Sequence, residues 1–127
     1  MERDVEGWKK KVGALGEKVA EEYLSETEGY LVLHKNYRCP LGEIDLICKD
    51  GDYLVFVEVR SSTRQSVNMA AESINYRKQR KLKQLASYYL WEKGLSYHLC
   101  RFDVLLLLLD AEKEKAQEKR FLKNAFF

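Results

Sequence analysis

Hydrophobic residues recur at helical spacing near the start of the chain. The apolar positions are Trp8, Val12, Leu15, Val19 and Tyr23. Their separation by three or four residues predicts an amphipathic helix over residues 8–26. Gly13 and Gly16 lie inside this helix, where glycine costs about 1 kcal/mol relative to alanine. They indicate either a close approach by another element or an irregular first turn.

Three segments rich in β-branched and aromatic residues follow, over residues 30–38, 43–49 and 53–60. This composition is typical of strands. A Pro-Leu-Gly sequence separates the first two segments, and Asp50-Gly51 separates the second from the third. Both are turn signals, and Asp-Gly in particular favours a tight hairpin. The third segment is apolar almost without interruption, so we expect a central strand buried on both faces.

The second half of the chain repeats the change from helical to extended patterns. Residues 61–73 are small and polar and predict a loop with a helical turn near residues 69–72. Residues 74–93 predict a second long helix. Its expected inner face comprises Ile74, Leu82, Leu85, Ala86, Tyr89 and Leu90. A buried strand is expected over residues 97–109, then a solvated charged segment over 110–120 and an apolar end that docks on the domain.

The predicted order is α-β-β-β-α-β, which indicates an α/β fold with a mixed central sheet flanked by helices. A length of 127 residues fits one domain, residues 1–127. The net charge of +2 neither requires nor excludes a nucleic-acid partner. Three widely spaced cysteines favour reduced thiols over a disulfide framework. The longest apolar run, Val104 to Leu109, is too short to cross a bilayer, so we expect a cytoplasmic protein.

Two of the acidic residues in the predicted strands stand out because apolar residues flank them. Asp45 is between Ile44 and Leu46, and Glu58 is in the most apolar strand. A buried carboxylate is costly unless it is paired, hydrogen-bonded or bound to a metal. Because a tight turn joins the two strands, cross-strand neighbours are expected about 5 Å apart. Two carboxylates at that distance raise each other's pKa, and a hard divalent cation such as Mg²⁺ relieves the repulsion.

Other charged residues accompany this pair. Arg60 is expected on the same strand face as Glu58, as a cation beside the metal or as a structural ion-pair partner. Glu17 either faces inward from the first helix or is an exposed helical glutamate. Glu43 is either an outer metal ligand or a turn residue.

The second helix begins with a run of cations. Candidate nucleic-acid contacts are Arg77, Lys78, Gln79, Arg80 and Lys81. Cations on one helix face contact phosphates in some proteins, whereas in most a charge run is simply a solvated face. Lys78 lies on the inner stripe, so it either extends along apolar surface to solvent or reaches the acidic site. Gln79 could reach that site by hydrogen bonding.

Several short segments, in this order, resemble the YraN-like family of bacterial proteins. They are Gly16-Glu17-Lys18-Val19-Ala20, Asn36-Tyr37-Arg38, Gly42-Glu43-Ile44-Asp45-Leu46-Ile47, Phe56-Val57-Glu58-Val59-Arg60 and Arg101-Phe102-Asp103-Val104. That family is similar to archaeal Holliday-junction resolvases and to the PD-(D/E)XK nucleases. The resemblance implies a restriction-endonuclease-like core and a Mg²⁺- or Mn²⁺-dependent endonuclease that cleaves DNA, including branched or damaged DNA.

The resemblance also assigns roles to individual residues. Asp45 and Glu58 match the acidic metal ligands, and Glu17 matches the glutamate of the first helix in resolvase-like members. Arg60 stands where the family usually has lysine, and arginine is effectively always protonated. Catalysis by Asp45, Glu58 and Arg60 is therefore weighed against a DNA-binding protein with impaired catalysis and against a structural adaptor. Resolvase-like relatives act as dimers, which implies a homodimer.

Overall fold

The computed structural model describes residues 5–95 and 98–126. The helical elements are α1 (Val5–Glu22), the π-helical turn η1 (Tyr23–Thr27), α2 (Val67–Ala71) and α3 (Tyr76–Glu92). The strands are β1 (Leu31–Cys39), β2 (Gly42–Asp50), β3 (Tyr53–Ser62), β4 (Cys100–Asp110) and β5 (Lys115–Phe126).

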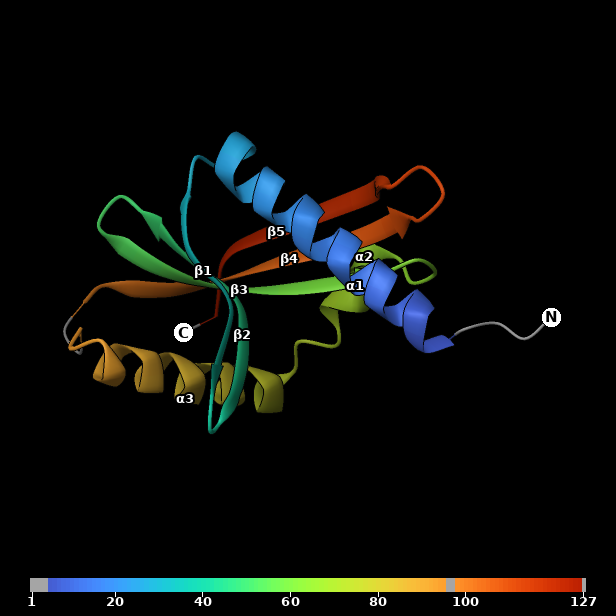
Figure 1. Cartoon of the computed structure of the whole chain (residues 1–127). Coiled ribbons are helices and arrows are strands. Elements are labelled where there is room, and N and C mark those ends of the chain that lie inside the picture. The colour runs from blue at the N-terminus through green and yellow to red at the C-terminus, as the bar shows by residue number, and fades with distance from the viewer. Residues whose placement is uncertain (1–4, 96–97, 127) are drawn as a thin grey trace.

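One five-stranded sheet forms the centre of the molecule, with strand order β1-β2-β3-β4-β5 (Figure 1). β3 and β4 are parallel, joined through α2 and α3, and the other neighbouring pairs are antiparallel. The predicted mixed α/β fold is therefore confirmed, and it is compatible with a nuclease-like core.

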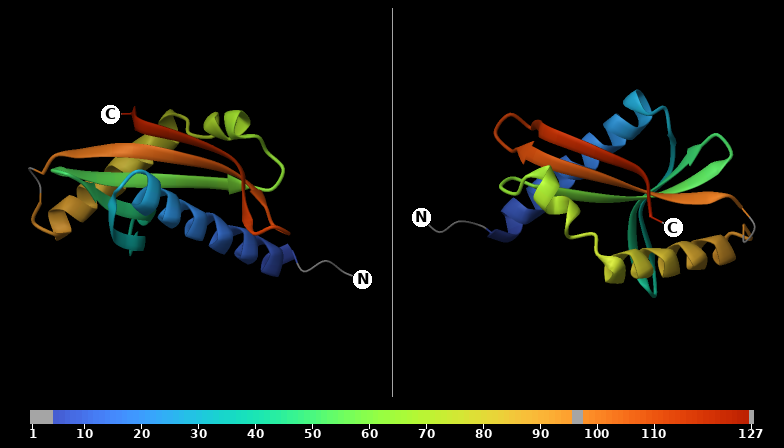
Figure 2. Two further views of the ribbon diagram at one scale, coloured as in Figure 1. Left: turned by 90° about the horizontal axis from the view of Figure 1, so that it is seen from above. Right: turned by 180° about the vertical axis from the view of Figure 1, so that it is seen from behind.

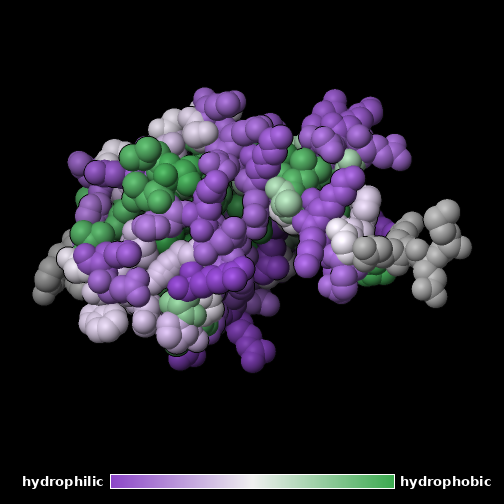
Figure 3. Space-filling model, in the orientation of Figure 1, coloured by the Kyte–Doolittle hydropathy of each residue, from purple (hydrophilic) through white to green (hydrophobic). Residues whose placement is uncertain are grey.

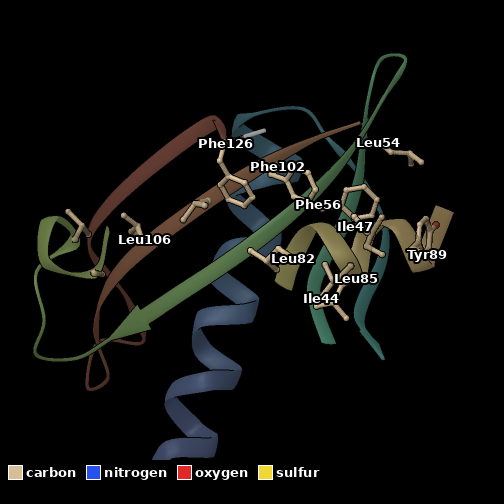
Figure 4. Packing of buried hydrophobic residues seen from close by; sticks show 14 residues of the cluster. Ile44, Ile47, Leu54, Phe56, Leu82, Leu85, Tyr89, Phe102, Leu106 and Phe126 are labelled. Carbon is tan, nitrogen blue, oxygen red and sulfur yellow. The ribbon is translucent and has the colours of Figure 1, made fainter. Parts of the chain in front are cut away.

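Helices cover both faces of the sheet, with α1 on one and α2 and α3 on the other (Figure 2). Ala20 and Leu24 pack with residues of β2, β3 and β4 on the α1 side. On the other side Leu82, Leu85 and Tyr89 of α3 pack against β2, β3 and β4, as Figure 4 shows. Since β3 contributes to both clusters, its prediction as a doubly buried central strand is confirmed.

Gly16 explains how closely α1 approaches the sheet. A Cβ atom added at Gly16 would lie 2.5 Å from Ser61 Oγ and 2.9 Å from Ser61 Cβ. Around Gly13 nothing lies within 4 Å of such an atom. The close approach expected from the two glycines is therefore present at Gly16 alone.

The end of the chain differs from the sequence prediction. Residues 110–120 were expected to be a solvated segment, but from Lys115 onward they form β5, paired antiparallel with β4. The charged side chains are exposed, as expected, but the backbone pairs with β4 as an edge strand, which the sequence did not predict. The apolar end does dock, since Phe126 stacks on Phe102 with ring centroids 5.0 Å apart.

The surface of the molecule is largely hydrophilic on the face that Figure 3 shows, with hydrophobic side chains gathered mainly on the left of that view. Cys39, Cys48 and Cys100 are free thiols, as expected. Among the residues that the structure describes, no helix is long and apolar enough to cross a membrane.

Candidate metal and nucleic-acid site

The site lies where β2 separates from β3. The antiparallel register pairs Leu46 with Val57, and one more step would place Asp45 opposite Glu58. Pairing ends before that step, and the backbone N–H of Val59 donates instead to Asp45 Oδ2 at 2.8 Å. The Asp45 carboxylate thus accepts the hydrogen bond of an N–H group on the neighbouring strand, which fixes the carboxylate beside Glu58.

Glu58 is buried, with 7% of its surface exposed, and two cations contact its carboxylate. Arg60 Nε lies 3.4 Å from Glu58 Oε1, and Lys78 Nζ lies 3.5 Å from the same atom. Of the two alternatives for Lys78, the structure therefore shows the one in which its amine reaches the acidic site. Arg60 Nε is buried, and within the described part of the chain it makes no hydrogen bond.

Burial and mutual repulsion make the negative charges of Asp45 and Glu58 unfavourable. Burial and the nearby Asp45 raise the pKa of Glu58 to about 7, although Lys78 and Arg60 act to lower it. Burial also raises the pKa of Asp45, with Glu43 and Glu17 adding to the rise and the Val59 hydrogen bond and Lys78 opposing it. Two cations therefore do not fully compensate this group of acids.

Glu17 and Glu43 form the exposed rim of the site, and Asn36 bridges them. With its amide oriented by the hydrogen-bond network, Asn36 donates to Glu17 Oε1 at 3.0 Å and to Glu43 Oε1 at 2.9 Å. Asn36 adopts a left-handed conformation, with φ of 51°. Glu43 also pairs with Arg38 at 3.6 Å. Glu17 is thus an exposed residue on the Asp45 side of the site, hydrogen-bonded to β1.

Sequence reasoning gave no role to Asn36 or to the Val59 N–H. The only local signal at Asn36 is its residue type, because asparagine is among the few residues that adopt positive φ readily. The Val59 N–H leaves no trace in the sequence, since every residue except proline carries such a group.

The remaining candidate residues lie along α3. Arg77, Arg80 and Lys81 are exposed. The side-chain amide of Gln79 donates to the Ile74 carbonyl at 3.1 Å, so this group stabilises the start of the helix. Asn75 is the N-cap and accepts from the Lys78 N–H at 3.0 Å, which fixes the first turn of α3 and the position from which Lys78 reaches Glu58.

Asp45 and Glu58 have the donor chemistry of a divalent-cation site. Mg²⁺ prefers oxygen ligands and is usually held by one or two carboxylates together with water and substrate phosphates. Within residues 5–95 and 98–126, no group of three or more His, Cys, Asp and Glu side chains is arranged to hold a metal ion. A metal held by these two carboxylates would therefore need its other ligands from solvent and substrate.

A second buried acid, Asp103, has a structural environment instead. It is 1% exposed and accepts hydrogen bonds from Tyr30 Oη at 2.8 Å, Arg101 Nε at 3.1 Å and the Asn124 N–H at 2.8 Å. Arg101 also bonds Asp50 at 2.7 Å. This network joins β4 to β5, to the end of β2 and to the segment before β1, so its polar groups are satisfied internally.

Taken together, the mixed sheet, the covering helices and the paired acids on β2 and β3 define an α/β protein compatible with a nuclease-like core. Comparison with known sequences gives the family. Residues 16–107 match the family described as "Uncharacterised protein family UPF0102".

Full-length relatives agree with that match. A UPF0102 protein of Pelotomaculum thermopropionicum is 46% identical over 118 residues, covering 93% of this chain and 97% of the relative. One from Clostridium acetobutylicum is 42% identical over 117 residues, covering 92% and 94%. The chain belongs to the UPF0102 family, and its resemblance to the YraN-like family is confirmed.

Proposed function

We propose that this protein is a metal-dependent endonuclease-like enzyme that hydrolyses phosphodiester bonds in DNA. One observation carries the proposal: Asp45 lies beside the buried Glu58, whose pKa is raised to about 7 despite two neighbouring cations. Strongly perturbed acids are typical of functional sites, although structural ion pairs also produce them. A divalent cation bound between Asp45 and Glu58 would supply the positive charge that these two carboxylates need.

The residues divide into metal ligands and phosphate-binding cations. Asp45 and Glu58 would hold Mg²⁺ or Mn²⁺, and Glu17, whose charge acts on Asp45, would be their outer partner. The metal would supply an activated water and charge neutralisation at the scissile phosphate. Arg60 and Lys78 would then turn from Glu58 toward phosphate oxygens, a role that suits both a guanidinium and an ammonium.

The substrate proposal rests on α3. Arg77, Arg80 and Lys81 are exposed on the helix whose Lys78 contacts Glu58, so cations continue outward from the acidic site. Such contacts bind the phosphate backbone without reading sequence. Branched and damaged DNA are the substrates to test first, and a cytoplasmic homodimer is the state we propose, by analogy with resolvase-like relatives.

A second candidate function is DNA binding without cleavage. The Arg60–Glu58 ion pair favours it, because arginine holds its proton and occupies the carboxylate that a metal would need. A structural adaptor, in which the acids serve only as an ion-pair cluster, is the third candidate.

A cleavage assay separates these candidates. We expect the wild-type chain to nick a labelled four-way DNA junction with Mn²⁺, and Asp45→Asn to lower the rate at least about 100-fold. Arg60→Lys should raise the rate at least about tenfold, since lysine adapts more readily to a site that orients water. Asp52→Asn, at the exposed β2–β3 turn, is the matched control. Absence of cleavage by wild type and by Arg60→Lys, with junction binding intact, would favour the binding protein.

A further inference from the structure

The second half of α3 carries an aromatic pair, one exposed and one half-buried, beside a hollow. Trp91 is 69% exposed, and its ring lies 5.6 Å from the Tyr88 ring at an interplanar angle of 62°. Both residues line a hollow of about 640 Å³, together with Leu41 at the tip of the β1–β2 hairpin. Large aromatic side chains are costly to leave in water, and here the exposed Trp91 and the half-buried Tyr88 present apolar surface at the hollow.

Cations connect this hollow to the acidic site. Arg80 and Lys83 line the hollow, and a neighbouring hollow of about 500 Å³ is lined by Arg77 and Lys78. The two hollows share Arg80 and Gln84. The helix has no acidic residue before Glu92. A basic track formed by the cations of residues 77–83 therefore runs from the Lys78–Glu58 contact toward the aromatic pair, with the neutral Gln84 and Ser87 between them.

The distance from Lys78 to Trp91, which covers the basic track and the aromatic pair, suits a short strand of nucleic acid. Residues 78 to 91 span about 20 Å along the helix axis at 1.5 Å per residue. That distance corresponds to about six nucleotides at the spacing of one strand in a duplex. A strand with its phosphates on the cations would bring its bases to the aromatic end.

We propose that Tyr88 and Trp91 form a stacking platform for an unpaired base, so that this surface binds a single-stranded segment of nucleic acid. The inference rests on the proposed function in naming the substrate class, since it predicts DNA with an unpaired strand next to the cleavage site. Charge complementarity selects the occupant, because the first half of α3 is basic and the helix has no acidic residue before Glu92. Only a nucleic acid supplies regularly spaced phosphates together with flat apolar rings. Stacking of bases on aromatic side chains tolerates any sequence.

Trp91 can report on its own contacts. The chain has two tryptophans, so Trp8→Phe leaves Trp91 as the single tryptophan, whose emission is excited selectively over that of the tyrosines. This variant is titrated with a mixed-sequence 12-nucleotide single strand in chelator. A 12-nucleotide abasic strand, which has the phosphates without the bases, serves as the comparison. We expect the ordinary strand to quench Trp91 and to bind at least about tenfold more tightly than the abasic strand.

Substitution tests the same contact with a labelled strand. Trp91→Ala should weaken binding at least about tenfold, whereas Trp91→Phe should keep most of the affinity because it keeps an aromatic face. Arg80→Ala with Lys83→Ala should weaken the ordinary and abasic strands alike and reduce the dependence on salt. Thermal unfolding checks that each variant is folded, which the exposure of Trp91 leads us to expect.

Three results would overturn the inference: equal affinity for the two strands, unchanged affinity in Trp91→Ala, or equal displacement by an acidic peptide, which would indicate a protein partner. Because binding is measured in chelator, where metal-dependent cleavage cannot occur, the test of the stacking platform is independent of the test of the nuclease. Binding through Trp91 without cleavage of any DNA would refute the nuclease alone. Cleavage that is indifferent to Trp91 would refute the stacking platform alone.

Discussion

At the scale of single residues, Glu58 is the acid whose surroundings are least favourable to its ionised form. It is almost fully buried, lies beside Asp45, and has Arg60 and Lys78 as counter-ions. A purely structural ion pair gains stability when its carboxylate is ionised, and its pKa falls. Here the pKa rises, so folding disfavours the charged form of Glu58 relative to the unfolded chain. The site is therefore maintained at a cost in stability near neutral pH.

This cost gives a prediction for stability against pH. The pKa of Glu58 rises from 4.5 to about 7, so the folded state binds more protons than the unfolded state between these values. The free energy of unfolding should then fall as pH rises through that window. At about 1.36 kcal/mol per pKa unit, Glu58→Gln should gain up to about 3 kcal/mol relative to wild type between pH 4.5 and pH 8.

Urea unfolding of both proteins in chelator, at several pH values, measures that difference. Glu72→Gln, at an exposed position after α2, is the matched control and should parallel wild type. If the Glu58→Gln curve also parallels wild type, then the folded protein does not raise the pKa of Glu58.

Residue type and spacing were enough to predict the acidic pair. Asp45 and Glu58 stand out because each interrupts an apolar strand, and the Asp50-Gly51 turn fixes their register. The contact between Lys78 and Glu58 was one of two alternatives, because the sequence gives the helix face and leaves the reach of a flexible side chain open. Asn36 depends on tertiary contacts between α1, β1 and β2, which no local pattern records.

At the scale of elements, the packing of α1 on β3 depends on the absence of one methyl group. Gly16→Ala would place its Cβ against Ser61, so we expect a loss of about 1–3 kcal/mol in the free energy of unfolding, typical of overpacking. Gly13→Ala has open space and should gain up to about 1 kcal/mol from helix propensity.

Chemical unfolding of both variants and of Gly16→Ala combined with Ser61→Gly tests this packing. The double variant should recover part of the loss, because it removes the atoms that the new methyl group meets. Equal effects of the two alanine substitutions would show that α1 does not approach β3 as closely as the structure has it.

The strands and long helices were predictable because their hydrophobic periods are clear. β5 was not, since its first half reads Lys-Ala-Gln-Glu-Lys-Arg and resembles a solvated segment. Charged side chains are a common feature of edge strands, where they discourage pairing with other chains. A sequence pattern reports which side chains are buried, and an edge strand that is exposed on most of its length gives little such signal.

At the scale of the whole molecule, the departure of β2 from β3 organises the site. While the two strands stay paired they build the core, and beyond Leu46 the hairpin of β1 and β2 turns toward α3. A Cβ atom at Gly42 in this hairpin would lie 3.5 Å from Leu85, so the hairpin tip contacts α3. The half-buried Asp45 thereby lies beside the buried Glu58, in the region between β3, the hairpin and the basic helix.

The central claim is that Asp45 and Glu58 together bind a divalent cation, and calorimetric titration with Mn²⁺ tests it most directly. We predict binding of one ion to wild type, with proton release and with affinity rising from pH 6 to pH 8, because the metal takes the deprotonated carboxylates. Asp45→Asn and Glu58→Gln should each weaken binding at least about tenfold, while Asp52→Asn leaves it unchanged. Absence of Mn²⁺ binding at pH 8, or equal binding by all four proteins, would contradict the account.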